Sequence, residues 1–588
     1  MTRSVVEDRP IARWRLRFAN WNPAQLSLPL LGVGLALALI IVPLISLVIF
    51  SLRTGAPWAP GVFTFDNYAV AYGQSQTYQM LGRTFVFALA STAISLVLAT
   101  LLAFMTERTD IPFRNVAWAL TLLPLAIPGL LFAVSWTFLL SPKIGLYNLW
   151  LRDFFGLFGI EFDSGPIEVY SLTGMILIEG LRGVATNFII IVGAFRNMDP
   201  SFEDAARMSG ASNAATIRRI FLPLMMPVLL SAGIYSFMTH LESLEIPLVI
   251  GFPSKVYVFS SYIYFTTQRM TPPQFGLSSA LGASFLLISI FLVIGYRKFT
   301  GSSSRYATVT GKAFRPSVHH LGRWRWPCFA ILLLYLLLTV AGPSFILIWS
   351  SLLPYYAPPT LEMLEDLSFT HYFSVLGDQN VRKAVVNSML VAAMSAAITM
   401  TLALSVAWIV VRSRRRLAGL IDVLMFLPHA LPGVIIGIAL MLVFVQPPLG
   451  QLGLFGSSTV IALGLTVSYI AFGSRTMIAA LKQIGGELEE AGASAGAGWW
   501  TIMRRIVLPL LLSSFVGGFI WIGSQAMRNL SIPLMLSTRE TETISIVMWR
   551  KWNDGYPGQT ATLGILLIIF VACTGALGRY LSTRKLKA

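Results

Sequence analysis

The sequence is poor in charged residues and in cysteine. Only 12% of its 588 residues are Asp, Glu, Lys or Arg, about half the share of an average soluble domain. Its two cysteines, Cys328 and Cys573, both lie in apolar stretches, and neither belongs to a metal-ligand spacing. These shortages exclude a soluble enzyme, a disordered protein and a secreted domain held by disulfides.

Apolar runs fill most of the chain, of which 55% is hydrophobic. Runs of about 20 apolar residues can cross a hydrocarbon layer about 30 Å thick, and they recur along the sequence. We predict an all-α membrane protein with about twelve transmembrane helices, near residues 28–51, 83–105, 116–139, 170–195, 226–247, 277–296, 327–352, 384–411, 420–446, 457–480, 510–530 and 561–580. The third and ninth spans are expected to kink or break at their prolines, Pro124, Pro128, Pro428 and Pro432.

The positive charge predicts orientation in the membrane. The net charge is +17, and with the N-terminus inside most Lys and Arg residues fall on the cytoplasmic side of the predicted spans. We therefore expect cytoplasmic N- and C-termini, contact of the basic segments with anionic membrane lipid, and no nucleic-acid partner. No cleavable signal is expected, because a full span follows the first arginines. Residues 11–21 could form an interfacial anchor or simply a basic flank.

An internal repeat divides the chain into two halves. Residues 123–129 (LPLAIPG) reappear 304 positions later, whereas residues 218–224 (RRIFLPL) reappear 286 positions later. The first half therefore has 18 additional residues, which fall most naturally in the loop 141–169. Because each half has six predicted spans, the repeats are parallel and a substrate path is expected between them. We divide the chain into a basic N-terminal segment (1–27), a first half (28–296), a cytoplasmic linker (297–326) and a second half (327–588).

The strongest signal is a loop that occurs between the fourth and fifth spans of each half. Residues 204–211 (DAARMSGA) and 490–497 (EAGASAGA) each place an acidic residue six positions before a glycine, and a proline follows thirteen positions later. This spacing predicts a short helix, a sharp turn at Gly210 or Gly496, and a second helix that continues into the next span. Ser201 is a candidate N-cap of the first short helix, and the small side chains after the acidic residue leave a face that a partner can approach closely.

These loops resemble the EAA loop of binding-protein-dependent permeases of ATP-binding-cassette (ABC) importers, in which the loop is a coupling helix docked on a cytoplasmic ATPase subunit. The resemblance covers both halves and implies a type I ABC importer permease fold in a bacterial inner membrane. It also implies two copies of the ATPase subunit and a periplasmic substrate-binding protein. It assigns ATPase coupling to Glu203, Asp204, Ala205, Ala206, Gly210, Ala211, Glu490, Ala491, Gly492, Gly496 and Ala497. Asp204 in place of the usual Glu, and Gly492 in place of the second Ala, predict unequal ATPase contacts in the two halves.

The chain has no phosphate-binding loop. The nearest candidate, Gly311 with Lys312, is followed by Ala313 and has Tyr306 where the first glycine should stand. We therefore expect a transport subunit that is not an enzyme and holds no cofactor, with ATP and Mg bound by its partner subunits.

A second resemblance is to the ferric-iron permease group. It rests on residues 306–312 (YATVTGK), 242–247 (ESLEIP) and 531–533 (SIP). It implies ferric iron as the substrate, whereas related permeases for thiamine, phosphonates, polyamines and sulfate share the framework and remain alternatives. Alternatives of other classes are an ion-coupled secondary transporter, a membrane enzyme and a channel. A secondary transporter needs no paired loops, and the sequence lacks the clustered residues of an enzyme site.

Charged residues inside predicted spans are candidates for the translocation path, because charge in a bilayer is costly. Glu179 and Arg182 share one helical face near the middle of the fourth span. They could line the path or satisfy each other as a packing pair. With them we assign to the path Glu242, Glu245, Gln525 and Arg528.

Glu242 and Glu245 lie with His240 near the expected outer end of the fifth span, where the second half has Ala526, Arg528 and Ser531. Carboxylates suit a hard ferric ion. The presence of carboxylates in one half and a cation in the other also suits two other substrates, iron that travels with an anion and a zwitterion. Alternatively, both glutamates are solvated loop residues. No permanent metal site is expected, because a path must release its cargo. His319 and His320 are interpreted as part of a basic, lipid-facing segment, and His371 and His429 receive no role.

Overall fold

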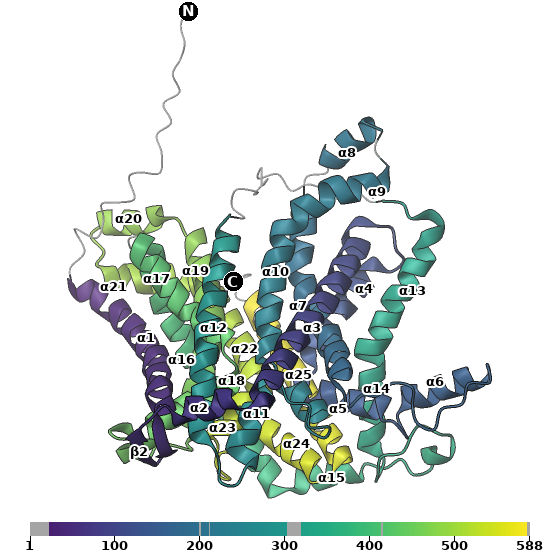
Figure 1. The fold of residues 1–588 in the computed structure, drawn as a ribbon. Helices are drawn as coiled ribbons and strands as arrows, with labels where there is room; N and C mark the ends of the chain where they lie inside the picture. The colour runs from purple at the N-terminus through teal and green to yellow at the C-terminus, as the bar shows by residue number, and fades with distance from the viewer. Residues whose placement is uncertain (1–22, 199–200, 211, 303–318, 413–414, 585–588) are drawn as a thin grey trace, which may run out of the picture.

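The computed structural model describes residues 23–198, 201–210, 212–302, 319–412 and 415–584 (Figure 1). Within these ranges ten helices are long and apolar enough to cross a membrane, and the number rises to twelve if each of two bent helix pairs is counted as one span. The prediction of an all-α membrane protein with about twelve transmembrane helices is confirmed. The segment 11–21, Ala211 and the linker motif 306–312 lie outside the described residues.

The first half begins with a long helix and a small antiparallel hairpin of two strands. Its elements are α1 (Pro23–Ser51), β1 (Arg53–Ala56), β2 (Ala59–Phe63), α2 (Asp66–Gly73), α3 (Ser75–Arg108), α4 (Arg114–Thr121), η3 (Leu123–Ala126), α5 (Gly129–Leu140), α6 (Leu146–Gly156), α7 (Leu172–Asn197), α8 (Ser201–Met208), α9 (Asn213–Thr216), η4 (Ile217–Phe221), α10 (Leu222–Glu242), η5 (Pro247–Gly251), α11 (Phe259–Tyr264), η6 (Phe265–Arg269) and α12 (Phe275–Ser302).

The second half follows the same plan. Its elements are η8 (Gly322–Trp324), α13 (Arg325–Leu336), η9 (Leu337–Ala341), α14 (Gly342–Leu352), η10 (Glu362–Leu364), α15 (Thr370–Gly377), α16 (Gln379–Arg412), α17 (Arg415–Phe426), η11 (Leu427–Ala430), α18 (Gly433–Val445), η12 (Leu449–Leu452), α19 (Ser458–Gln483), α20 (Gly486–Ser494), α21 (Trp499–Ile502), η13 (Met503–Val507), α22 (Leu508–Arg528), α23 (Ser531–Leu536), α24 (Ile544–Asn553) and α25 (Pro557–Arg584).

The two halves have the same orientation. The short helices α8 and α20 lie at one end of the molecule (Figure 1). We call this end the hairpin face, because each short helix forms a helical hairpin with the helix that follows it. The two β-strands, α15 and α24 lie toward the other end, which we call the opposite face. In each half the longest helix packs along the helix that precedes the short one, α3 along α7 and α16 along α19. The prediction of parallel repeats is therefore confirmed.

The third and ninth spans are broken at their prolines, as predicted. The segments Arg114–Ala126 and Gly129–Leu140 meet at 101°, and Leu417–Ala430 and Gly433–Val445 meet at 106°. Pro128 and Pro432 stand directly before α5 and α18. Proline is tolerated there because backbone N–H groups at the start of a helix have no carbonyl partner within the helix, so the missing N–H of proline costs no hydrogen bond.

The fifth span ends earlier than predicted. We expected it over 226–247, but α10 ends at Glu242. A helix that continued would need the N–H of residue 247 to bond the carbonyl of Ser243, and Pro247 has no N–H. The hydroxyl of Ser260 donates to that carbonyl instead. The chain after Glu242 therefore leaves the helix while it is still inside the bundle.

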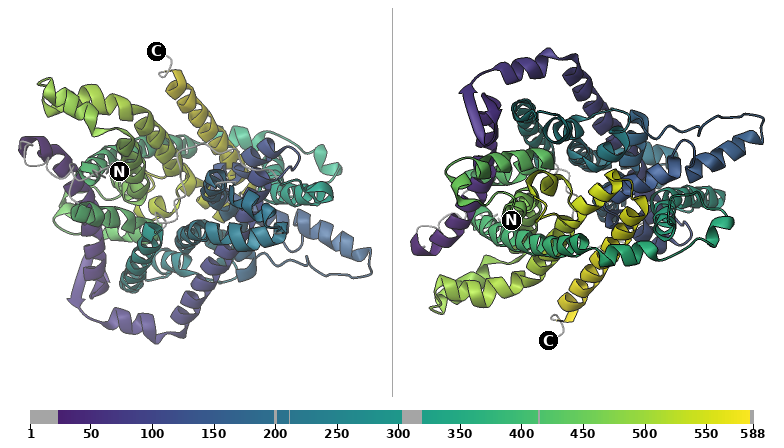
Figure 2. Two further views of the ribbon diagram at one scale, coloured as in Figure 1. Left: turned by 90° about the horizontal axis from the view of Figure 1, so that it is seen from above. Right: turned by 90° about the horizontal axis from the view of Figure 1, so that it is seen from below.

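The first helix of each half packs against the other half. Helix α1 contacts α12 of its own half but also α16 and α18, and α14 contacts both α25 and α5. Close approach of α12 permits this, because a Cβ on Gly282 would lie 3.4 Å from Leu47 of α1 and 3.5 Å from Ile435 of α18. Views along the molecule show the spans of the two halves intermixed (Figure 2).

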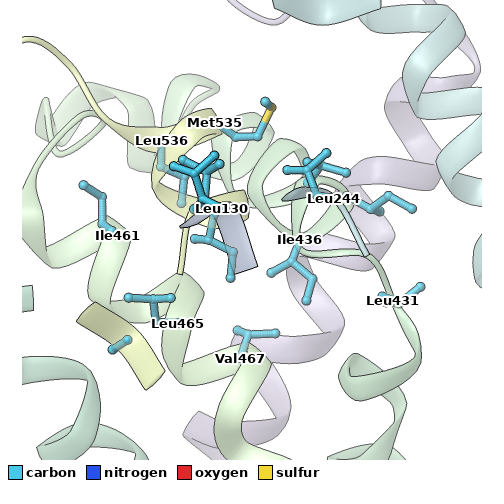
Figure 3. Packing of buried hydrophobic residues seen from close by; sticks show 14 of the residues in the cluster. Leu130, Leu244, Leu431, Ile436, Ile461, Leu465, Val467, Met535 and Leu536 are labelled. Carbon is cyan, nitrogen blue, oxygen red and sulfur yellow. The ribbon is translucent and has the colours of Figure 1, made fainter. Parts of the chain in front are cut away.

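A buried apolar cluster joins the halves at their centre (Figure 3). Leu130 and Leu244 of the first half lie in one cluster with Ile436, Met535 and Leu536 of the second. Leu130 follows the break in the third span, and Leu244 follows the end of α10. The packing therefore fixes the broken segments of the first half against the second half.

Candidate functional site

Each half presents a helical hairpin at the hairpin face. Gly210 follows α8 with φ +74°, and Gly496 follows α20 with φ +80°. A Cβ on either glycine would meet nothing within 4 Å, so the left-handed backbone, rather than lack of space, requires glycine. The predicted sharp turn is confirmed at both positions.

The second arm of each hairpin contains a π-helical segment at the same place, η4 in the first half and η13 in the second. Pro223 and Pro509 stand two residues after these segments and cannot donate to the carbonyls four residues before them. The hydrogen-bond ladder therefore widens by one residue before each span begins.

The two small residues of each short helix face in different directions. Ala205 and Ala491 are exposed, whereas Ala206 is buried. A Cβ on Gly492, the counterpart of Ala206, would lie 3.1 Å from both Ile502 and Ile506 of the second arm. The prediction that both small residues leave a face for a partner is therefore wrong for Ala206 and Gly492, which are small because the arms of their own hairpin touch.

An arginine at the end of a long helix supports each hairpin. Arg412, the last residue of α16, forms an ion pair with Glu489 of α20, and the exposed fractions of their side chains are 15% and 11%. Arg108, the last residue of α3, is fully buried, and its guanidinium lies 5.6 Å from the centre of the Phe221 ring in the second arm. It also donates to the carbonyls of Phe195 at 2.8 Å and Met198 at 3.1 Å, at the end of α7. Sequence reasoning missed these residues, although the two arginines recur at the repeat offset of 304.

The remaining predicted coupling residues lie on the surface of the hairpins. Glu490 and Ala491 are exposed on α20, and Ala497 is half-buried after the turn. The side chains of Glu203 and Asp204 lie outside the described part of the structure. Ser201, predicted as the N-cap of the first short helix, is instead the first residue of α8.

The end of the linker packs on the first half at His319, which corrects the interpretation of that residue as lipid-facing, whereas the side chain of His320 is 86% exposed. The backbone N–H of His319 donates to the carbonyl of Arg108 at 2.8 Å, and its ring lies 6.1 Å from the rings of Phe104 and Phe221. The ring of His320 lies 3.2 Å from a carboxylate oxygen of Asp110.

A backbone hydrogen bond of 2.9 Å from Leu321 fixes the carboxylate of Asp110. That bond, with a smaller contribution from His320, lowers the pKa of Asp110 from its ordinary value of 3.8.

A cluster of charged side chains lies inside the first half. The guanidinium of Arg182 is 3.9 Å from carboxylate oxygens of both Glu179 and Glu245. The hydroxyl of Ser243 donates to Glu179 at 2.8 Å, and Nε2 of His240 lies 4.0 Å from the same carboxylate. The structure thus joins two sets of residues that the sequence placed apart. Arg182 is shared between two carboxylates, so it does not form a closed pair with Glu179.

The cluster lies deep in the bundle. His240 shares a hydrogen bond of 3.0 Å with Thr92, which stands at the middle of the 34-residue helix α3. The side chains of Glu179 and Glu245 are 4% and 16% exposed. The alternative that Glu245 is a solvated loop residue is therefore wrong.

The second half contributes a cation to the same region. Arg528, at the end of α22, donates to the carbonyl of Leu125 in the broken third span and to the side chain of Gln525. Arg182 packs on the other side of that break, where a Cβ on Gly129 would lie 2.6 Å from its guanidinium. Two arginines, one from each half, therefore flank the break.

Further aromatic contacts connect the halves beside this cluster. Tyr235 of α10 stacks on His429 of η11 at 5.0 Å, although His429 had received no role. Glu242, half-buried at the end of α10, interacts electrostatically with Glu245 and Glu179. Within the described ranges, His, Cys, Asp and Glu side chains form no group of three or more that could hold a metal ion.

Comparison with known proteins decides the family. The family described as the binding-protein-dependent transport system inner membrane component matches residues 95–302 and again residues 380–587. The chain belongs to this family. It is therefore an ABC importer permease with two fused halves, each of which contains one of the hairpins described above.

The permease is similar over most of its length to proteins named for ferric transport. It is 24% identical to the ferric transport system permease protein FbpB of Actinobacillus pleuropneumoniae, over 85% of this chain and 72% of that protein. It is 23% identical to the Fe(3+)-transport system permease protein FbpB 2 of Haemophilus influenzae, over 84% of this chain and 88% of that protein. A sulfate transport system permease protein, CysT of Escherichia coli, is 27% identical over 35% of this chain and 78% of that protein.

Among solved structures, a chain of a bacterial alginate ABC transporter in complex with a periplasmic protein is 18% identical. The match covers 45% of this permease and 97% of that chain, with a TM-score of 0.37.

Proposed function

We propose that this permease imports ferric iron and that two ATPase subunits drive it by docking on α8 and α20. The observation that carries the proposal is the pair of hairpins, which stand on one face and share a left-handed glycine, a π-helical arm and an arginine support. The names of the relatives that match more than four fifths of the chain favour iron.

The hairpins transmit movement because each is fixed to the spans behind it. When the ATPase subunits close on ATP and Mg, they displace the exposed faces of α8 and α20. The ion pair of Arg412 with Glu489 transmits this displacement to α16. In the first half, the contact of Phe221 in the second arm with the Arg108 guanidinium transmits it to α3, and the hydrogen bonds of Arg108 connect α3 with the end of α7. Because α3 and α16 are continuous helices of 34 residues, the displacement reaches the opposite face and rocks the halves.

The charged cluster is the contact surface for the passing ion. Glu179, Glu242 and Glu245 offer a passing ferric ion the carboxylate oxygens that it prefers, as separate contacts rather than as one ligand set. Arg182 keeps two of these carboxylates partly neutralised. Such an arrangement binds weakly enough to release its cargo. Arg528 and Gln525 approach from the second half, so movement of the halves changes the distance between cation and carboxylates.

The hairpin face is cytoplasmic in this proposal, with both termini on that side of a bacterial inner membrane. The opposite face then receives the substrate from a periplasmic binding protein. The paired arginines in the second arms of the hairpins, Arg218 with Arg219 and Arg504 with Arg505, are consistent with this orientation, because the positive-inside rule favours Lys and Arg on the cytoplasmic side.

The test is uptake of radiolabelled ferric iron by proteoliposomes that contain the permease, its ATPase subunits and its binding protein. Gly210→Ala combined with Gly496→Ala forces a side chain into the left-handed region at both turns, at a cost of about 1–2 kcal/mol each. We expect uptake to fall at least tenfold, or about 1.4 kcal/mol. The matched control is Gly453→Ala, because Gly453 also has positive φ (+62°) and open space but lies outside the hairpins.

Equal uptake by the double variant and the control would contradict the coupling role. Uptake that persists without ATP and collapses with an ion gradient would indicate a secondary transporter, and uptake that needs neither would indicate a channel. Labelled sulfate in place of iron tests the anion alternative that the two arginines and the sulfate relative suggest.

A further inference from the structure

Helix α6 forms a projecting arm that has no counterpart in the second half. It lies in the loop 141–169, where the first half has its additional residues, whereas the equivalent loop of the second half contains only the short η12. Figure 2 shows α6 extending away from the bundle in both views. The arm begins after Leu140, the end of α5, and its return segment leads into Leu172, the start of α7. It therefore stands at the level where these two spans leave the bundle.

The base of the arm is rigidly held. The side-chain amide of Asn148, which is 1% exposed, donates to the carbonyls of Leu140 and Ile167 at 2.8 and 2.9 Å and accepts from the N–H of Ile167 at 3.1 Å. The hydroxyl of Tyr147 donates to the carbonyl of Leu337 in η9 at 3.2 Å. The outward direction of α6 is thus fixed by bonds to two spans.

Beyond the base, the arm is apolar and exposed. Phe154 packs against Phe155 at 5.7 Å and against Phe158 at 5.3 Å, so the tip is an aromatic cluster. Phe158 is 68% exposed and Leu157 82% exposed. The further exposed apolar residues of the arm are Trp150, Ile160 and Phe162. An exposed patch of this kind on a soluble surface marks an interaction site.

We propose that the arm lies in the interface of the membrane leaflet at the opposite face and anchors the first half to lipid. Three observations favour lipid over a protein partner. The arm points radially away from the centre where the halves meet, it stands at the level of the span ends, and its base contacts η9, whose Leu337 is 44% exposed on a membrane-spanning helix. Aromatic side chains with flanking charges, such as Arg152 and Asp153, prefer this region of a bilayer.

The experiment places a fluorophore at the tip in permease that is otherwise intact. Cys328 and Cys573 are replaced by Ser, and Phe158→Cys is labelled with a polarity-sensitive dye in lipid nanodiscs. Phosphatidylcholine brominated on its acyl chains is the lipid probe, and iodide is the aqueous probe. The lipid control is Phe291→Cys, 74% exposed on the span α12. The aqueous control is Leu361→Cys, 86% exposed beside the acidic residue Glu362.

We expect brominated lipid to quench position 158 at least about threefold more than position 361, and iodide to show the reverse order. The proposal is overturned if position 158 behaves like position 361 with both quenchers. It is equally overturned if protection from iodide develops only when the substrate-binding protein is added, because the arm would then be a protein contact. Neither result depends on which substrate is transported or on the ATPase subunits.

Discussion

The ion pair of Arg412 with Glu489 should determine how firmly α20 is held. Removing one partner of a fully buried pair costs about 3–5 kcal/mol, whereas an exposed pair contributes about 0–1 kcal/mol. With side chains 15% and 11% exposed, this pair lies between these limits, and we expect Glu489→Gln to destabilise the hairpin by about 2 kcal/mol. Since 1.4 kcal/mol is a factor of ten, the opening equilibrium of α20 should rise about 30-fold.

Amide hydrogen exchange of residues 486–494 measures this opening directly. The matched control is Glu487→Gln, which removes the same charge from an exposed residue of the same helix. We expect the control to raise the opening equilibrium by at most about fivefold, because an exposed charge near a helix N-terminus contributes about 0.3–1 kcal/mol. A double-mutant cycle with Arg412→Gln isolates the pair. A coupling free energy below about 0.5 kcal/mol would refute the reasoning, because the pair would then behave like one on the surface.

Two further predictions concern the break and the linker. Gly129→Ala should displace the guanidinium of Arg182, which lies 2.6 Å from the position of the new Cβ. We expect this variant to lower iron uptake without changing the melting temperature. The control Gly82→Ala, where the new Cβ meets open space, should change neither uptake nor melting temperature. Because the pKa of Asp110 is lowered, its bond to Leu321 should be fully present above pH 3.8 and lost as the pH falls through the lowered value. The protection factor of the Leu321 amide against hydrogen exchange should therefore be constant from about pH 5 to 8. At pH 7 this amide should exchange faster in Asp110→Asn than in the unchanged protein. Equal protection factors in the two proteins would contradict the prediction.

The local features of this fold are readable from the sequence because they depend on a few residues with strict backbone requirements. Proline before α5 and α18 breaks two spans, and Gly210 and Gly496 turn the hairpins. Repetition at fixed offsets then gives the parallel arrangement. Each of these predictions rests on a residue type that only a few conformations tolerate.

The contacts between side chains of different helices could not be predicted from the sequence in this way. Glu179 and Glu245 are 66 positions apart, and only the close approach of α7 and α10, where a Cβ on Gly183 would lie 2.6 Å from His240, brings them to one arginine. Helix contacts inside a membrane carry little hydropathy signal, because lipid tails are as apolar as leucine. The inward direction of Gly492 could not be distinguished from an outward one for a different reason: a small residue suits both close contact between the arms of the hairpin and close approach of a partner.

The crossing of α1 and α14 into the opposite half has a consequence for how such a protein can be divided. If the chain were cut within residues 303–318, each fragment would still present a surface made to receive the other's leading helix. Neither fragment alone could cover the face of α16 that α1 occupies or the face of α5 that α14 occupies. Two separately expressed pieces should therefore find each other in the membrane and assemble as a dimer, with the covalent connection serving to keep their numbers equal.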